Sequence, residues 1–136
     1  MLFRSIVSVS GGNIVITPNG SGRTRVTNLE APMQLNNNTA TSYTCTLDDA
    51  DKMITLNNGS AVTVTIPANG TVAYPIGTKL NFAQLGAGQV TVAIVSDTLN
   101  YDATLSAKLN GQYAVATALK TTSTSWLLFG NLEPAA

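Results

Sequence analysis

The stretch Val62-Thr63-Val64-Thr65-Ile66 alternates apolar and threonine side chains without a break. Side chains of an extended strand point to opposite faces in turn, so this pattern gives a strand with one buried and one open face. Residues with a branched β-carbon also favour a pleated, half-buried strand. The stretch therefore predicts a β-sheet that covers a hydrophobic core with one of its faces.

Several other segments are composed in the same way. Each contains β-branched or aromatic residues and is bounded by Asn, Gly, Asp or Pro, which interrupt strands and form turns. These segments are residues 14–17, 23–27, 53–56, 78–82, 89–94, 113–119 and 125–129. The turn sequences between them are Pro18-Asn19-Gly20, Asn57-Asn58-Gly59, Asn69-Gly70, Gly86-Ala87-Gly88 and Asn110-Gly111. Short strands joined by hairpin turns predict an all-β fold, with an antiparallel β-sandwich or jelly-roll-like body.

Residues 47–52 are the exception, because they predict one short helical turn between two strands. Asp48, Asp49 and Asp51 lie in this segment, but they lack the regular spacing and the distal glutamate of a calcium-binding loop. We therefore expect a capped helical turn with solvated carboxylates and no metal site.

The composition changes near residues 31–35, which a run of asparagines follows. Residues 1–35 contain short strand patterns whose apolar content, chiefly Ile14, Ile16 and Val26, is expected to be too small for a core of their own. Ordering the backbone costs about 1–2 kcal/mol per residue, which so few apolar side chains do not offset. We therefore expect residues 1–35 to be an extended β-rich N-terminal arm for attachment and oligomerisation. Residues 40–136 are expected to form the body.

The charge content excludes several kinds of partner. Charged residues make up 10% of the chain, and seven Lys and Arg balance seven Asp and Glu. An average soluble domain is about 25% charged. Such a chain has no positive field to attract nucleic acid or an anionic membrane. Its longest apolar run, near residues 126–130, is far shorter than the roughly 18 residues that span a bilayer. We expect no nucleic-acid partner, no membrane insertion and, since residues 1–7 lack a cleavage site, no secretory signal.

The residue types needed for catalysis are largely missing. The sequence has no histidine, which excludes a Ser-His-Asp or Cys-His arrangement and a histidine metal site. Cys45 is the single cysteine and is expected to be an inert thiol in a strand. No pair of carboxylates indicates a glycosidase. We therefore expect a protein that is not an enzyme, without catalytic residues, cofactor or metal.

Five residues are the candidate interface residues. Ile14, Ile16, Arg23 and Arg25 lie on the predicted strands of the arm. The two arginines either meet an acidic patch of a neighbouring subunit or form a solvated edge that prevents wrong strand pairing. Trp126 lies in an apolar run and is expected in the core or in a subunit interface. The four tyrosines and Trp126 form either a sugar-stacking platform or buried anchors of the core.

Two parts of the chain resemble proteins of bacteriophage particles. The segment of residues 13–22, with its Thr17-Pro18-Asn19-Gly20 sequence, resembles a unit of phage tail-fibre shafts. From residue 43 onward the chain is similar to a domain of phage virion proteins. The matching stretches are residues 49–58, 62–67, 74–78, 86–91 and 111–113, followed by 126–130. Asp51 departs from this pattern, because such sequences often carry glycine before the lysine.

This resemblance implies a structural component of the virion, often trimeric: a capsid-decorating or cement protein, a head fibre or a tail-fibre subunit. It acts by assembly and surface presentation. The implied partners are further copies in a homotrimer and phage capsid or tail proteins, and the implied location is the virion, assembled in the host cytoplasm. The alternative is a receptor-binding module of a fibre tip that recognises a host surface glycan. Loops of Asn, Gly and Thr favour assembly over glycan recognition.

Overall fold

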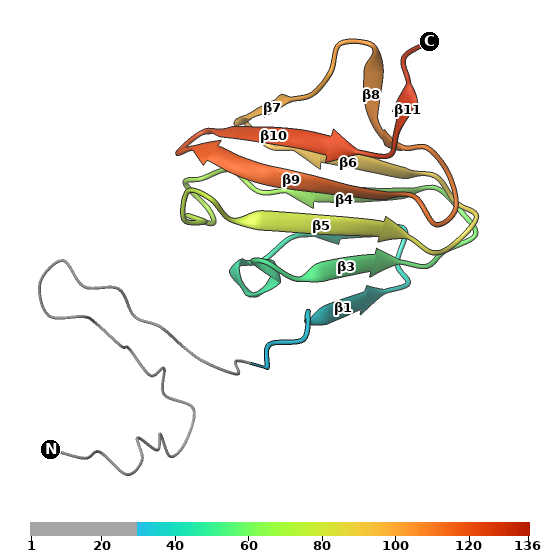
Figure 1. Cartoon of the computed structure of the whole chain (residues 1–136), viewed down its shortest axis with the longest axis horizontal. Coiled ribbons are helices and arrows are strands. Elements are labelled where there is room, and N and C mark those ends of the chain that lie inside the picture. Colours follow the sequence, from blue (N-terminus) through green and yellow to red (C-terminus); the bar gives the residue numbers. More distant parts are fainter. Residues whose placement is uncertain (1–29) are drawn as a thin grey trace, which may run out of the picture. The chain divides into compact units, whose positions relative to one another are not determined.

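The computed structural model describes residues 30–136 (Figure 1). The chain divides at Ala31, and the unit Pro32–Ala136 contains all the described strands. The candidate interface residues Ile14, Ile16, Arg23 and Arg25 lie outside the described residues, as does most of the expected arm.

Two mixed β-sheets make up the unit Pro32–Ala136. The strands of the six-stranded sheet, in spatial order, are β1 (Leu35–Asn38), β3 (Met53–Leu56), β5 (Lys79–Gln84), β9 (Val115–Thr122), β10 (Ser125–Gly130) and β7 (Thr98–Asn100). Those of the five-stranded sheet are β11 (Leu132–Pro134), β8 (Leu105–Leu109), β6 (Val90–Ile94), β4 (Val62–Ile66) and β2 (Ser42–Thr44). In Figure 1 the six-stranded sheet lies in front and β4 and β6 lie behind it.

The expected all-β fold class is confirmed for the described residues. Among residues 30–136 the one helical element is a 3-10 turn, η1 (Leu47–Asp49), inside the segment predicted to form a helical turn. No helix in this part of the chain has the length and apolar character needed to cross a membrane.

The predicted antiparallel arrangement with hairpin connections is wrong for the first half of the body. From β1 to β9, each strand lies in the sheet opposite to that of the strand before it. As a result, β1, β3 and β5 are parallel neighbours in one sheet, and β2, β4 and β6 are parallel neighbours in the other. The chain thus coils through three stacked turns, which we call rungs, and each rung contributes one strand to each sheet.

The second half of the body completes both sheets with mostly antiparallel strands. β9 pairs antiparallel with β5 and with β10, and β8 pairs antiparallel with β6 and with β11. β10 also pairs in parallel with β7. Among the described strands, β9 and β10 are the one consecutive pair that forms a hairpin.

The strands β4 and β6, in the second and third rungs, have nearly the same sequence, so identical residues lie next to each other in the sheet. The stretch Val90-Thr91-Val92-Ala93-Ile94 repeats the pattern of β4. The two strands pair in parallel, with Val on Val at the first and third positions and Ile on Ile at the last. Identical inward side chains therefore stack along the core, which explains why the coil continues in register.

The core lies between the two sheets. The inward side chains Val64 and Ile66 of β4 and Leu80 and Phe82 of β5 are completely buried. Each such side chain contributes about 1.5–3 kcal/mol on burial. The outward Thr63 of β4 is exposed, so the alternation predicted from the sequence is confirmed at this strand.

Close stacking of two turns requires glycine. The turn between β5 and β6 lies on the turn between β3 and β4, and the N–H of Gly88 donates to the carbonyl oxygen of Asn58 at 2.9 Å. A β-carbon at residue 88 would lie 1.8 Å from the carbonyl oxygen of Ser60. One at Gly86 would lie 2.2 Å from that of Asn58. These glycines, predicted only as turn residues, therefore allow the third rung to approach the second.

Candidate assembly surface

The outward side chains of the six-stranded sheet combine apolar residues with polar residues that are almost all uncharged. Pairing aligns Leu35, Met53, Asn81, Thr117 and Phe129 in one row across five strands. Neighbouring rows bring Ala83 beside Val115, and Leu119 beside Leu127. We call this surface the apolar face, made up of Leu35, Met53, Ala83, Val115, Leu119, Leu127 and Phe129.

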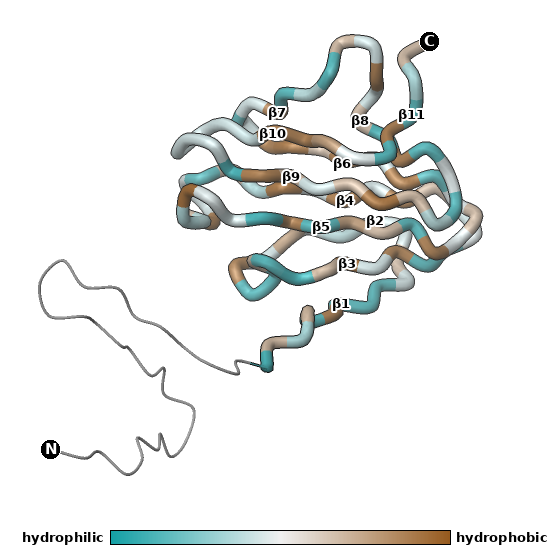
Figure 2. Tube along the Cα trace, in the orientation of Figure 1, coloured by the Kyte–Doolittle hydropathy of each residue, from teal (hydrophilic) through white to brown (hydrophobic). Residues whose placement is uncertain are grey.

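Large side chains of the apolar face remain open to solvent in the single chain. Leu35 is 59% exposed, Val115 42%, Leu127 41% and Phe129 48%. Figure 2 shows hydrophobic colour along β9 and β10, the strands that carry three of these four residues. Single exposed apolar residues are ordinary, but a contiguous group of them marks an interaction surface.

The polar residues between these side chains are already hydrogen-bonded within the chain. The hydroxyl of Thr117 donates to Oδ1 of Asn81 at 2.8 Å, and Nδ2 of Asn81 donates to the carbonyl oxygen of Lys52 at 3.0 Å. The hydroxyl of Thr55 donates to Oδ1 of Asn37 at 2.7 Å. Covering this face would therefore leave these polar groups satisfied, and desolvation would cost little.

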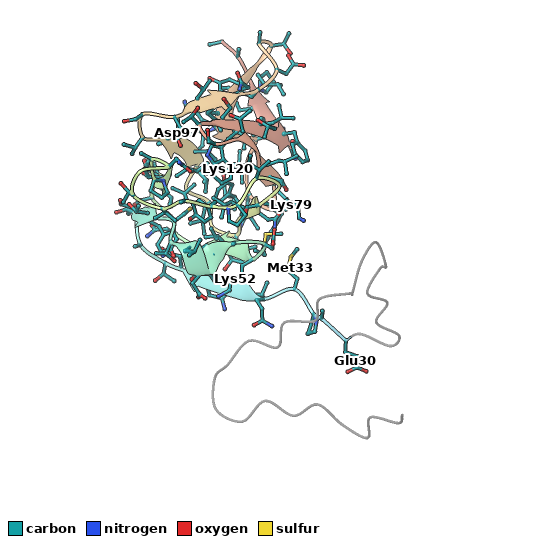
Figure 3. All side chains as sticks on the ribbon, turned by 90° about the vertical axis from the view of Figure 1, so that its left-hand side faces the viewer. Glu30, Met33, Lys52, Lys79, Asp97 and Lys120 are labelled. Atoms are coloured by element: carbon teal, nitrogen blue, oxygen red, sulfur yellow. The ribbon has the colours of Figure 1, made fainter. Side chains whose placement is uncertain are left out.

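Charge is confined to one end of the apolar face. Among the described strand residues that point outward from this sheet, Lys79 is the one charged side chain. Its Nζ lies 3.7 Å from Oδ1 of Asp51 in the same chain. In Figure 3 Lys79 lies at the margin of the body.

The outward side chains of the five-stranded sheet differ from those of the apolar face. Ser42, Thr63, Thr91 and Lys108 align in one row. The next row consists of Thr44, Thr65 and Ala93. This surface, which we call the threonine face, resembles the water-facing side of a one-sided sheet. The two sheets thus present opposite surfaces: one suited to water and one suited to a protein contact.

The edges of the two sheets also differ between their ends. β11 contains Glu133 and Pro134, and a charge or a proline discourages pairing with another chain. β1 (Leu35–Asn38) and β2 (Ser42–Thr44), the edge strands of the first rung, contain neither charge nor proline. β7 (Thr98–Asn100), the other edge strand of the six-stranded sheet, also contains neither, so among the described edge strands β11 is the one protected in this way.

The acidic cluster expected in the helical turn is divided by the fold. Asp48 is exposed and pairs with Lys52 on the same turn. Asp49 is only 2% exposed, so the expectation that the whole cluster is solvated is wrong for this residue. No group of three or more potential metal-binding side chains occurs in residues 30–136.

Asp49 connects both strands of the first rung to η1. Its carboxylate accepts from Nδ2 of Asn36 at 2.8 Å, from the hydroxyl of Tyr43 at 2.7 Å and from the backbone N–H of Thr46 at 2.7 Å. Burial raises the pKa of Asp49, but the hydrogen bonds from Thr46, Tyr43 and Asn36 outweigh this effect and hold the pKa below its ordinary value. Burial and the neighbouring carboxylate raise the pKa of Tyr43 to about 12. The carboxylate therefore serves as a structural acceptor.

Trp126 lies in the core. Its side chain is fully buried, with the ring edge-on to Tyr74 at a centroid distance of 5.4 Å. Nζ of Lys120 lies 5.6 Å from the Trp126 ring centroid and donates to Oδ1 of Asn69 at 2.6 Å. Figure 3 shows Lys120 inside the body. Trp126 was expected either in the core or in a subunit interface, and in the structure it lies in the core.

The structure does not bring the aromatic residues together as a platform. Tyr74 is buried, whereas Tyr101 is 39% and Tyr113 72% exposed, in separate loops after β7 and β8. Cys45 is 1% exposed, and burial raises its pKa to about 12, which keeps the thiol protonated. No pocket is present in the described part of the chain.

The residues of the apolar face were missed as a surface, although the sequence carries a signal for them. Residues 126–129 are all apolar. In a strand such a run must place apolar side chains on both faces. Trp126 and Leu128 point inward, which leaves Leu127 and Phe129 outside.

Comparisons with known proteins give no family for this chain. Neither a scan against protein-family models nor a search of curated proteins found a match.

Proposed function

We propose that this protein is a non-enzymatic structural component of a bacteriophage virion, acting by assembly and surface presentation. The observation that carries the proposal is the apolar face, an outward sheet surface with one charged residue at its margin. A group of exposed apolar side chains of this kind marks a surface for contact with another protein. The subunit is a capsid-decorating or cement protein, a head fibre or a tail-fibre subunit.

Two features of the sequence support this proposal. The low charge content and the many Asn, Thr and Ser residues suit a protein that functions within an assembly, in contact with other proteins. The stretches that resemble phage fibre and virion proteins include β3, β4 and the Trp126–Phe129 run, which here form the core and the apolar face. We assign residues 32–136, which include β1 as well as the predicted body 40–136, to a β-sandwich body with mixed sheets, and the residues before them to an attachment arm.

The proposed partners are further copies of the chain, in a homotrimer, and phage capsid or tail proteins. Assembly takes place in the host cytoplasm, and the assembled protein is located in the virion. The two sheets suit this arrangement, since the threonine face remains toward water while the apolar face is covered.

Purified particles test the proposal directly. Mass spectrometry and electron microscopy of particles should find this protein, at a copy number that is compared with that of the major capsid protein. A number similar to that of the capsid protein indicates decoration, and a much lower number indicates a fibre. Absence of the protein from particles would refute the virion assignment.

The alternative function, a module that binds a host surface glycan, is favoured by one observation. Tyr113 is 72% exposed in the loop between β8 and β9, and exposed aromatic rings stack on sugars. A glycan array with the wild type and a Tyr113→Ala variant separates the two functions. Binding that the substitution abolishes would favour receptor recognition, and no binding would favour assembly.

A further inference from the structure

The apolar face has the composition of a contact between identical subunits, an inference that rests on the proposed assembly function. We propose that the apolar face is covered by another copy of this chain, with Leu127 close to the symmetry axis of the oligomer. The strands β9 and β10, which carry Val115, Leu127 and Phe129, form the centre of the contact.

Charge is the first argument for a second copy as the partner. A surface that meets its own copy must be self-complementary, and like charges facing each other would oppose the contact. The apolar face has only Lys79, which lies at one end and is paired with Asp51. The whole chain has a formal net charge of zero, so copies do not repel each other at long range. A strongly charged partner, in contrast, would find no opposite charges on this face.

The shape of the face is the second argument. Two sheets that pack face to face lie about 10 Å apart, with side chains of one filling spaces between those of the other. The apolar face offers both large and small side chains for such packing, because Phe129 lies beside the smaller Thr117 and Val115 beside the smaller Ala83. Its polar groups are hydrogen-bonded internally, as shown for Asn81, so no buried group of the face loses its partner in the contact.

We place the symmetry axis at the β9–β10 hairpin, because it carries three of the four large exposed side chains of the apolar face. Equivalent residues of different copies come close together only near a symmetry axis. Leu127 lies in the middle of β10 with Phe129 next to it on the same side, and Leu119 of β9 is directly opposite. Turning this hairpin towards the axis of the proposed homotrimer therefore places the copies of Leu127 near each other.

Sedimentation of the full-length protein and three variants over a wide concentration range tests this inference. Leu127→Glu and Phe129→Glu each place a carboxylate in the proposed contact. Thr63→Glu is the matched control, since Thr63 is an exposed strand residue of the threonine face. We expect the wild type and Thr63→Glu to form the same oligomer and the two apolar-face variants to sediment as monomers. All four proteins should have similar melting temperatures as monomers, because the altered side chains are exposed.

Disulfide trapping locates the contact. Leu127→Cys should form a cross-link between copies on mild oxidation, and Thr63→Cys should not. A wild type that is monomeric at every concentration would overturn the inference, and so would an oligomer that survives both glutamate substitutions or cross-links through residue 63. The particle analysis is separate, since a self-associating protein that is absent from particles would refute the virion function alone.

Discussion

Replacing Asp49 with asparagine tests whether one buried carboxylate holds the first rung together. The variant keeps the size of the side chain but puts an NH2 group in place of one acceptor oxygen. At least one of the donors Asn36, Tyr43 and Thr46 then faces another donor. A hydrogen bond to a charged group contributes about 1.5–3 kcal/mol, and a buried donor without an acceptor costs about 1–3 kcal/mol. We therefore expect Asp49→Asn to lower the free energy of unfolding by about 2.5–6 kcal/mol at neutral pH.

Urea denaturation followed by circular dichroism measures this loss, with Asp48→Asn as the matched control. Asp48 lies in the same turn but its side chain is 88% exposed, so we expect a change below about 0.5 kcal/mol.

The pH dependence of the stability gives a second readout. Because the folded pKa of Asp49 is lowered, its contribution is fully present above the pKa of the unfolded chain, about 4. The contribution is lost as the pH falls through the folded value. Equal stabilities of the two variants, or a difference that persists unchanged into strong acid, would refute the reasoning.

Other predictions concern the close approach of the rungs, the central tryptophan and the buried thiol. Gly88→Ala should destabilise the fold by at least about 1–3 kcal/mol in denaturant titrations, because its β-carbon meets a backbone oxygen at 1.8 Å, whereas Gly59→Ala, with nothing within 4 Å, should have little effect. Trp126→Ala should lose about 3–5 kcal/mol in the same assay, and a loss below about 1 kcal/mol would contradict its place in the core. Cys45 should resist alkylation at mildly alkaline pH and react fully in denaturant, as followed by mass spectrometry; rapid labelling of the native protein would show that the thiol is accessible.

Local features of the fold followed directly from the sequence. The strands Met53–Leu56 and Val62–Ile66 were predicted to the residue, because the alternation in Val62–Ile66 and the turn residues that bound both strands are local signals. The partners of these strands were not predictable in the same way. Period-two patterning is the same in parallel and antiparallel sheets, and Asn57-Asn58-Gly59 suits a hairpin as well as a crossing to the other sheet. Only the path of the whole chain decides between a hairpin and a crossing to the other sheet.

The candidate site was less accessible to sequence reasoning because it depends on distant residues. Asp49 is buried by Asn36 and Tyr43, which come from two strands that precede it in the chain, and no local pattern shows this. The apolar face is assembled from five strands in register. For Leu127 and Phe129 the apolar run around them was a usable signal, but for Leu35 only the pairing of β1 with β3 reveals its place.

The alternation of strands between sheets has a consequence for synthesis of the chain. β3 and β5 find parallel partners among residues already made, but the other edge of β5 pairs with β9, which is separated from it by β6, β7 and β8. Until residues 115–122 leave the ribosome, β5 presents an unpaired edge, and open edges recruit other chains. Translation products that end between β6 and β9 therefore contain the three stacked rungs with that edge exposed, and we expect such fragments to associate through it.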